Sequence, residues 1–251
     1  MRGLKAAPVL WFDELDSTNA EARRRAEAGE AGPLWIAARR QTAGRGRRER
    51  VWETGEGNLA ATLLAATAKP PAEAAQLSFV AALAILDLAR DHVPQGLLAL
   101  KWPNDVLLDG GKLSGVLIES GRRAGGDIWL AIGMGVNLAR SPRRLDYPAA
   151  CLADHLTAAE LAPPSPEAAL ERLSDAFAVH AADWDSGGFA PIRERWTLAA
   201  KGLGARCTAQ LGHRTLEGVA EGLDAGGALL LRLDSGRLER ITAGDVFFGI
   251  P

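Results

Sequence analysis

Cysteine is scarce in this sequence of 251 residues, and this scarcity limits the classes of protein to which the chain can belong. Only Cys151 and Cys207 are present, far apart and in no C-x-x-C pattern. Disulfide-rich secreted domains and structural zinc sites need several cysteines at short spacings. The sequence therefore predicts neither, and we expect both thiols to be small buried side chains.

Several common catalytic and nucleotide-binding motifs are also missing. The sequence has no G-x-x-x-x-G-K-[ST] segment, which excludes a P-loop, and no G-x-S-x-G elbow of a serine hydrolase. Its histidines have no H-x-x-x-H spacing, which disfavours a zinc hydrolase. Gly133-Met134-Gly135 follows an apolar run, but no third glycine completes a Rossmann motif. A phosphate site in this chain must therefore be built in another way.

Strong net charge and long apolar runs are absent as well. The formal net charge is −2, so composition does not call for nucleic acid or an anionic membrane as partner. We find no stretch close to the roughly 18 apolar residues of a membrane span. Residues 1–8 lack the apolar segment of a signal peptide. These absences predict a cytoplasmic protein without a membrane partner.

The apolar pattern along the chain predicts an α+β fold. Strands are expected at 9–15, 34–38, 58–65, 97–101, 106–108, 113–119 and 128–136, and helices at 16–28, 74–93, 166–184 and 189–200. The helix at 74–93 has apolar residues round most of its circumference, so it should be the central buried helix. The four strands between 97 and 136 follow one another closely, which predicts a mainly antiparallel mixed sheet with packed helices.

After residue 203 the pattern changes to short β runs separated by glycine-rich turns. Strands are expected at 206–211, 215–223, 228–233, 238–241 and 246–248. Five short strands in so few residues are typical of a small β-barrel. We therefore predict a main domain at 1–202 and a small β domain at 203–251.

Glycine and arginine dominate the segment 41–57, which predicts a mobile loop. Its first part reads Gln-Thr-Ala-Gly-Arg-Gly-Arg-Arg. Glycine lets the backbone approach a ligand, and guanidinium groups are charged, forked donors for phosphate or carboxylate. The pattern suits the phosphates of a nucleotide. A solvated basic loop or a nucleic-acid-binding segment would have the same composition.

A second polar segment, at 101–105, reads Lys-Trp-Pro-Asn-Asp, and Lys112-Leu113-Ser114-Gly115 follows it. Pro103 ends the preceding strand, so Asn104 and Asp105 turn into a hairpin and Lys112 opens the returning strand. Amide, carboxylate and ammonium groups should then lie near one edge. The alternative is that the Asn-Asp pair only caps a turn, with the lysine in solvent.

Taken in order, these segments resemble the catalytic domain of the biotin–protein ligase family. The ordered set comprises Asp16-Ser17-Thr18-Asn19, the loop at 44–48, Trp52, 101–105, 112–115 and 133–137. The resemblance runs from about residue 10 to the C-terminus, where the β-rich tail is similar to the family's SH3-like domain. It implies an α+β domain related to lipoate ligases. Because the first expected strand begins near Val9, we expect no helix-turn-helix domain and no specific DNA binding.

The resemblance also implies which residues bind the substrates. It places Ser17, Thr18, Asn19, Gln41, Arg45, Gly46, Arg47, Lys112 and Gly115 around biotin, and Gly44, Arg48, Trp52, Lys101, Asn104 and Asn137 around ATP or the adenylate. Arg47 and Lys112 take the catalytic roles, because a carboxylate and a phosphate must be brought together. Mg²⁺ is expected with ATP, with no protein ligands assigned. Glu49, where the family commonly has glycine, is expected to pair with a neighbouring arginine.

The implied reaction is ATP-dependent formation of biotinyl-5'-AMP with release of pyrophosphate, followed by transfer of biotin to a lysine of a biotin carboxyl carrier protein. A lipoate or octanoate ligase or transferase of the sister families remains an alternative, since these enzymes share the fold and the acyl-to-lysine chemistry. A nucleic-acid-binding module is a more distant one. The sequence leaves open which carboxylase is the acceptor and whether the chain forms a homodimer.

Overall fold

The computed structural model describes residues 3–142, 147–157, 162–212 and 214–248. A seven-stranded sheet with the order β1-β2-β3-β7-β6-β5-β4 dominates the larger part. Its strands are β1 (Val9–Leu15), β2 (Leu34–Gln41), β3 (Leu59–Thr67), β4 (Leu98–Lys101), β5 (Asp105–Leu108), β6 (Gly111–Arg122) and β7 (Ile128–Val136). Strands β1 and β2 are parallel, and the other neighbouring pairs are antiparallel. The predicted mainly antiparallel mixed sheet is therefore confirmed.

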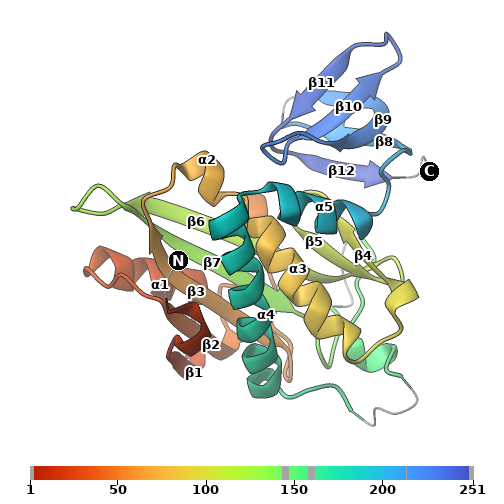
Figure 1. Cartoon of the computed structure of the whole chain (residues 1–251). Coiled ribbons are helices and arrows are strands. Elements are labelled where there is room, and N and C mark those ends of the chain that lie inside the picture. Colours follow the sequence, from red (N-terminus) through yellow and green to blue (C-terminus); the bar gives the residue numbers. More distant parts are fainter. Residues whose placement is uncertain (1–2, 143–146, 158–161, 213, 249–251) are drawn as a thin grey trace.

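Helices cover both faces of this sheet (Figure 1). They are α1 (Thr18–Glu27), α2 (Pro71–Ala74), α3 (Leu77–Arg90), α4 (Pro166–Gly187) and α5 (Ala190–Leu198). Successive side chains of a strand point to opposite faces. Leu34 and Ile36 of β2 accordingly pack in a small cluster with α1, whereas Trp35 and Ala37 belong to the larger core with α3 and α4. One sheet thus separates a small apolar layer from the main core.

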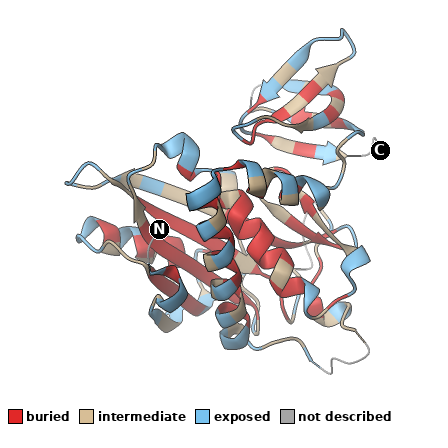
Figure 2. Cartoon of the chain, viewed as in Figure 1, coloured by how far each residue is buried: buried red, intermediate tan, exposed pale blue. Residues whose placement is uncertain are grey.

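Helix α3 is the central buried helix that the sequence predicts (Figure 2). The segment Pro71–Arg90, which contains α2 and α3, is in fact long and apolar enough to cross a membrane, contrary to the sequence-based expectation. However, 72% of its most apolar 18-residue stretch is buried inside the fold. Its apolar character is therefore explained by packing against α4 and the sheet.

The C-terminal part forms a second sheet with the order β11-β10-β9-β8-β12. Its strands are β8 (Arg206–Gln210), β9 (Thr215–Leu223), β10 (Leu229–Leu233), β11 (Leu238–Ile241) and β12 (Asp245–Phe248). All five predicted strands are present, but among the described residues β11 and β12 do not pair with each other. The structure therefore gives a five-stranded antiparallel sheet, and closure into an SH3-like barrel stays a prediction.

Candidate active site

The floor of the candidate site is a glycine surface on the α1 face of the central sheet. Along β7, Gly133 and Gly135 alternate with the core residues Ile132 and Met134, so both glycines face the α1 side. A Cβ atom on Gly133 would lie 2.2 Å from Asn19 Oδ1, and one on Gly135 would lie 2.3 Å from the Trp52 ring. The glycines that did not fit a Rossmann motif are required here because other side chains occupy the space above them.

The N-terminus of α1 forms the uncharged wall of the site. The Ser17 hydroxyl accepts a hydrogen bond from the backbone N–H of Ala20 and so caps the helix. The next two side chains, Thr18 and Asn19, are only 4% exposed. The backbone N–H of Thr18 donates to Gln41 Oε1 at 2.8 Å, which joins the helix start to the end of β2.

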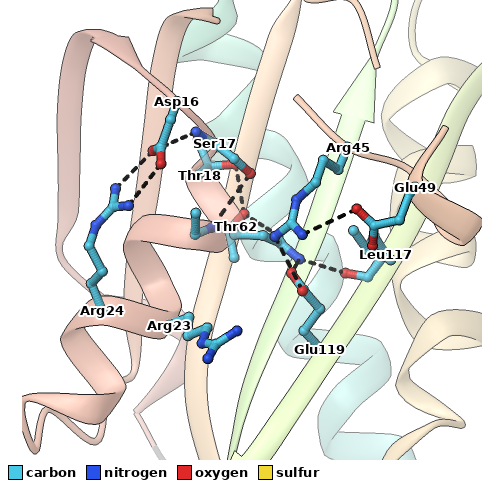
Figure 3. Close-up of polar contacts among 12 residues, drawn as sticks. Asp16, Ser17, Thr18, Arg23, Arg24, Arg45, Glu49, Thr62, Leu117 and Glu119 are labelled. Atoms are coloured by element: carbon cyan, nitrogen blue, oxygen red, sulfur yellow. Dashed lines mark hydrogen bonds and ion pairs between the residues drawn. The ribbon is translucent and has the colours of Figure 1, made fainter. Parts of the chain in front are cut away.

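Asp16 fixes the turn that leads into α1. Its carboxylate accepts two hydrogen bonds from the Arg24 guanidinium, both at 2.8 Å, and one from the backbone N–H of Ser17 (Figure 3). The bonds from Arg24 are the main reason why the pKa of Asp16 is lowered from 3.8 to about 2. The turn that presents Ser17 and Thr18 is thereby held by an ion pair outside the cavity.

The arginine-rich loop forms the opposite wall and adopts a defined turn. Arg47–Glu49 is a short 3-10 helix, and Arg45 and Val51 form an antiparallel bridge. The sequence predicted only a mobile loop, because glycine and arginine give no signal for such a turn. Arg45 pairs with Glu49 at 3.5 Å, as expected for that glutamate.

The loop is anchored to the C-terminal sheet. Arg47 donates one hydrogen bond to Asn104 Oδ1 at 3.0 Å and another to the carbonyl oxygen of Gly244 at 3.1 Å. Arg48 and Arg50 both form ion pairs with Asp245, the first residue of β12. Burial lowers the pKa of the Arg47 guanidinium, which nevertheless stays charged at neutral pH. Two parts of the chain about 200 residues apart thus build one wall of the site.

Lys112 lies between the two walls. Its ammonium group is 2.6 Å from Asp105 Oδ1, and it also lies over the rings of Trp52 and Tyr147. In the register of the sheet, Asp105 on β5 lies opposite Lys101 on β4 and opposite Gly115 on β6. The amide of Asn104, the carboxylate of Asp105 and the ammonium group of Lys112 therefore do meet at one edge. Burial is the main reason why the pKa of Lys101 is lowered. The alternative of a solvated Lys112 is wrong, because its side chain is only 20% exposed.

Two cavities meet at this point. The first, of about 80 Å³, lies over the glycine floor, and the second, of about 730 Å³, lies between the central sheet and the C-terminal sheet. They share part of their lining, here called the shared wall, which consists of Arg50, Asn104, Asp105, Lys112, Tyr147 and Asp245. A group bound in one cavity can therefore approach a group bound in the other beside Lys112.

The structure brings most of the predicted site residues together. The first cavity is lined by all nine residues predicted for biotin, namely Ser17, Thr18, Asn19, Gln41, Arg45, Gly46, Arg47, Lys112 and Gly115, and also by Trp52 and Asn104. Lys101 lines the second cavity. Three residues predicted for the nucleotide, Gly44, Arg48 and Asn137, line neither of these cavities.

Those three residues lie outside both cavities and contact residues that line them. A Cβ atom on Gly44 would lie 2.4 Å from the carbonyl oxygen of Trp52, so this glycine allows the loop strands to approach each other. Arg48 is turned toward Asp245. Asn137 is 2% exposed, and its amide group donates to the carbonyl oxygens of Lys112 and Ala150. Asn137 therefore holds the backbone that carries Lys112.

Sequence reasoning did not identify four residues that shape the site. Asp245 and Tyr147 line both cavities, whereas Glu119 and Thr62 stand behind the first one and contact Asn19. Strand alternation could have indicated Glu119, which shares a face with Gly115 on β6. No local pattern could have indicated Asp245, because its contacts span 195 and 197 residues.

No group of three or more His, Cys, Asp or Glu side chains suited to a metal ion is found among the described residues. The shared wall nevertheless contains the carboxylates of Asp105, here paired with Lys112, and of Asp245, here paired with Arg48 and Arg50. One or two carboxylates, completed by phosphate oxygens, are a usual environment for Mg²⁺. The residues therefore fit a magnesium ion that arrives with a nucleotide, rather than one held by the protein alone.

Comparisons with known proteins identify the family of this chain. The model of the biotin/lipoate A/B protein ligase family matches residues 11–137, and that of the biotin protein ligase C-terminal domain matches residues 202–249. A biotin–acetyl-CoA-carboxylase ligase of Paracoccus denitrificans is 45% identical over 236 residues, which are 93% of this chain and 98% of the relative. The chain belongs to the biotin/lipoate A/B protein ligase family.

Two further members of this family are similar over most of the chain. A bifunctional ligase/repressor of Bacillus subtilis is 31% identical over 96% of this chain and 74% of its own length. A solved biotin protein ligase from Aquifex aeolicus, in complex with biotin and ATP, superposes with a TM-score of 0.77. It is 24% identical, with 96% of this chain and 97% of the other covered, and it shows the shared fold.

Proposed function

We propose that this chain is an ATP-dependent biotin–protein ligase. It activates biotin to biotinyl-5'-AMP with release of pyrophosphate, and then transfers biotin to a lysine of a biotin carboxyl carrier protein. The relative from Paracoccus denitrificans, named as a ligase of acetyl-CoA carboxylase, supports a carboxylase carrier as the acceptor. The observation that carries the proposal is the meeting of two cavities beside Lys112, one with an uncharged inner wall of Ser17, Thr18 and Asn19 and the other with the added lysines Lys101 and Lys201.

The first cavity suits the bicyclic ring of biotin. Its deep end combines hydroxyl and amide groups of Ser17, Thr18 and Asn19 with a glycine floor. An uncharged ureido group needs such donors and acceptors, and a flat floor leaves room for a ring. The volume of about 80 Å³ is below the roughly 300 Å³ common for small-molecule pockets, so the arginine loop has to move outward to admit biotin.

The second cavity suits the nucleotide. Lys101 and Lys201 add positive charge to it, and Trp102 and Phe248 contribute apolar surface. In this arrangement the biotin carboxylate attacks the α-phosphate at the shared wall, and pyrophosphate leaves toward the wider cavity. Arg47 and Lys112 offset the charge of the two anions, whose repulsion would otherwise oppose the attack in a poorly hydrated site.

A magnesium ion bound with the ATP phosphates would supply further positive charge for this step. Asp105 and Asp245 would hold it from the shared wall, with Asn104 beside them. Asp105 already pairs with Lys112, so it also fixes the position of that ammonium group. Closure of the arginine loop then keeps water from the mixed anhydride until the acceptor lysine attacks and AMP leaves.

We also propose that residues 1–202 form the catalytic domain and residues 203–251 a small domain of the SH3-like type. The five-stranded sheet at 206–248 and the C-terminal family match support this division. Cytoplasmic location, absence of specific DNA binding and absence of a membrane partner remain part of the proposal. Gel-shift titration with operator-like DNA tests the second of these, and sedimentation with and without biotin and ATP distinguishes a monomer from a homodimer.

The decisive experiment supplies α-³²P-ATP and Mg²⁺ with either biotin or lipoate, and measures pyrophosphate release and the adenylate. We expect pyrophosphate release with biotin and none with lipoate. Adding a carrier protein should then transfer biotin to its acceptor lysine, and a carrier with that lysine changed to arginine should remain unmodified. Release with lipoate but not with biotin would assign the chain to the sister enzymes instead.

A further inference from the structure

A buried chain of hydrogen bonds connects Glu119, outside the first cavity, to Thr18 on its wall (Figure 3). Asn19 Nδ2 lies 2.8 Å from Glu119 Oε2, and Asn19 Oδ1 lies 2.7 Å from the Thr62 hydroxyl. The Thr62 hydroxyl in turn lies 2.8 Å from the Thr18 hydroxyl. Thr62 is fully buried and Asn19 is 4% exposed, so water does not compete for the bonds of Thr62, whereas the Glu119 side chain at the end of the chain is 26% exposed.

Glu119 determines the orientation of the Asn19 amide. An ionised carboxylate only accepts hydrogen bonds, so the Asn19 atom that faces it must be the NH₂ group. The carbonyl oxygen of Leu117, 3.4 Å from the same nitrogen, is a second acceptor on that side. The amide oxygen of Asn19 is therefore left to face Thr62.

The direction of the remaining bonds follows from counting hydrogens. A hydroxyl group has one hydrogen to donate. Thr62 donates its hydrogen to Asn19 Oδ1, so at the contact with Thr18 it can only accept, and Thr18 must be the donor there. The Thr18 hydroxyl then has no hydrogen left for Gln41 Oε1, 3.1 Å away, which already accepts the backbone N–H of Thr18.

The wall of the first cavity thus presents oxygen lone pairs from Thr18 and Gln41 side by side. Such a pair recognises an N–H donor rather than a second acceptor. In the proposed function, the matching groups of biotin are the N–H groups of its ureido ring. A ligand that lacks such a hydrogen would place an acceptor or a methyl group against these oxygens.

We propose that Glu119 is a positioning residue for biotin. It orients Asn19 and, through Asn19 and Thr62, makes the Thr18 hydroxyl an acceptor for a ureido N–H. This role rests on the proposed function. Glu119 also lies 3.4 Å from Arg45, so the test must separate the hydrogen-bond chain from that ion pair.

Two pairs of variants make this separation. Glu119→Leu removes the acceptor that Asn19 faces, and Thr62→Val interrupts the chain without touching Arg45. The matched controls are Glu49→Gln, which removes the other carboxylate near Arg45, at 3.5 Å, and Thr62→Ser, which keeps the hydroxyl. Steady-state pyrophosphate release would be measured with biotin and with an analogue methylated on its ureido nitrogens, beside thermal unfolding of each variant.

We expect both Glu119→Leu and Thr62→Val to raise the KM for biotin about tenfold, a loss of about 1.4 kcal/mol, with kcat and the KM for ATP within about twofold of wild type. Their preference for biotin over the methylated analogue should fall by a similar factor. The two controls should behave as wild type. If Glu119→Leu fails to fold, the two Thr62 variants still decide the question.

Three outcomes would overturn the role of Glu119. They are an unchanged KM for biotin in Glu119→Leu or Thr62→Val, an equal effect in Glu49→Gln, and an effect of Thr62→Ser as large as that of Thr62→Val. In each case an active wild-type enzyme leaves the proposed function standing. A wild-type protein without biotin-dependent pyrophosphate release would instead overturn the proposed function and this role with it.

Discussion

The two ends of the candidate site are built on different principles. At the biotin end, strand register and glycine determine the shape, and the polar groups of the inner wall, on Thr18 and Asn19, are uncharged and buried. At the nucleotide end, charged side chains from distant parts of the chain, such as Arg50, Lys112 and Asp245, determine the electrostatic field. The comparison teaches that recognition at the first end depends on space and hydrogen-bond direction, whereas chemistry at the second depends on charge held in place by contacts between the two sheets.

The largest effect should come from removing the charge where the two ends meet. We expect Lys112→Ala to fold and to lower pyrophosphate release at least a hundredfold, because it removes the cation that pairs with Asp105, while Arg50, the other cation of the shared wall, is paired with Asp245. Lys5→Ala, on the exposed N-terminal turn, is the control. A rate within about threefold of wild type, less than 1 kcal/mol of transition-state stabilisation, would show that Lys112 has no role in the chemistry.

The second prediction tests whether space governs the biotin end. In Gly133→Ala the new methyl group would lie 2.2 Å from Asn19 Oδ1 and must displace that side chain. We expect the KM for biotin to rise about thirtyfold or more, roughly 2 kcal/mol, while ATP binding changes little. Gly125→Ala is the matched control, because a Cβ atom there meets nothing within 4 Å. Unaltered biotin affinity in Gly133→Ala would contradict a floor shaped by glycine.

The third prediction separates making the adenylate from holding it. Arg47 joins the loop to Asn104 and to the carbonyl oxygen of Gly244. In Arg47→Gly the lost charge-assisted contacts cost about 1.5–3 kcal/mol each, but Lys112 remains for the chemistry. We therefore expect the variant to form biotinyl-adenylate but to release it at least tenfold faster, with biotinylation of bystander lysines.

Rapid filtration after mixing with biotin and labelled ATP measures this retention. Arg214→Gly, which removes an exposed arginine in the C-terminal part, is the control and should retain the intermediate. If Arg47→Gly also holds its adenylate as long as wild type, the loop does not clasp the intermediate.

The smallest effect concerns the ion pair that supports the biotin end from outside. The pKa of Asp16 is lowered to about 2 in the folded protein, chiefly by Arg24. Because the folded pKa lies below the unfolded one, this pair stabilises the protein above about pH 4, and the stabilisation is lost as the pH falls from about 4 to about 2. Both side chains are about half exposed, so its contribution should stay below about 1 kcal/mol.

Urea unfolding of Asp16→Asn and wild type checks this prediction. The difference in unfolding free energy should be present at neutral pH and should disappear near pH 2. Asp13→Asn is the control, because the Asp13 side chain is fully exposed and 3.6 Å from its partner Arg39. An Asp16→Asn deficit that persists at low pH would assign the effect to the turn rather than to the ion pair.

The sequence predicts the biotin end better than the nucleotide end for a physical reason. Alternation along β7 and the capping residues of α1 are local signals, so the strands, the helix start and the nine residues around the first cavity could be placed from the sequence and the family resemblance. Asn137 was assigned to the nucleotide from the resemblance, but only its contacts with the carbonyl oxygens of Lys112 and Ala150 reveal its supporting position.

The nucleotide end was less predictable because it depends on contacts between distant segments. Nothing near Asp245 in the sequence indicates that it anchors Arg48 and Arg50, which lie in and directly after the turn at Arg47–Glu49. The same limitation applies to the C-terminal strands. Their number was predictable from the apolar pattern, but their pairing into an open or closed sheet is decided by register.

The anchorage of the arginine loop by Asp245 sets an order of events during protein synthesis. The loop at 41–57 leaves the ribosome long before β12 does, and domains generally fold in the order in which they are made. A nascent chain can therefore form the glycine floor and the α1 wall while its loop still has no partner for Arg48 and Arg50. The site acquires its last wall only when the strand that carries Asp245 has been translated. A chain stalled before that point would have a formed biotin end and an arginine loop without its anchor.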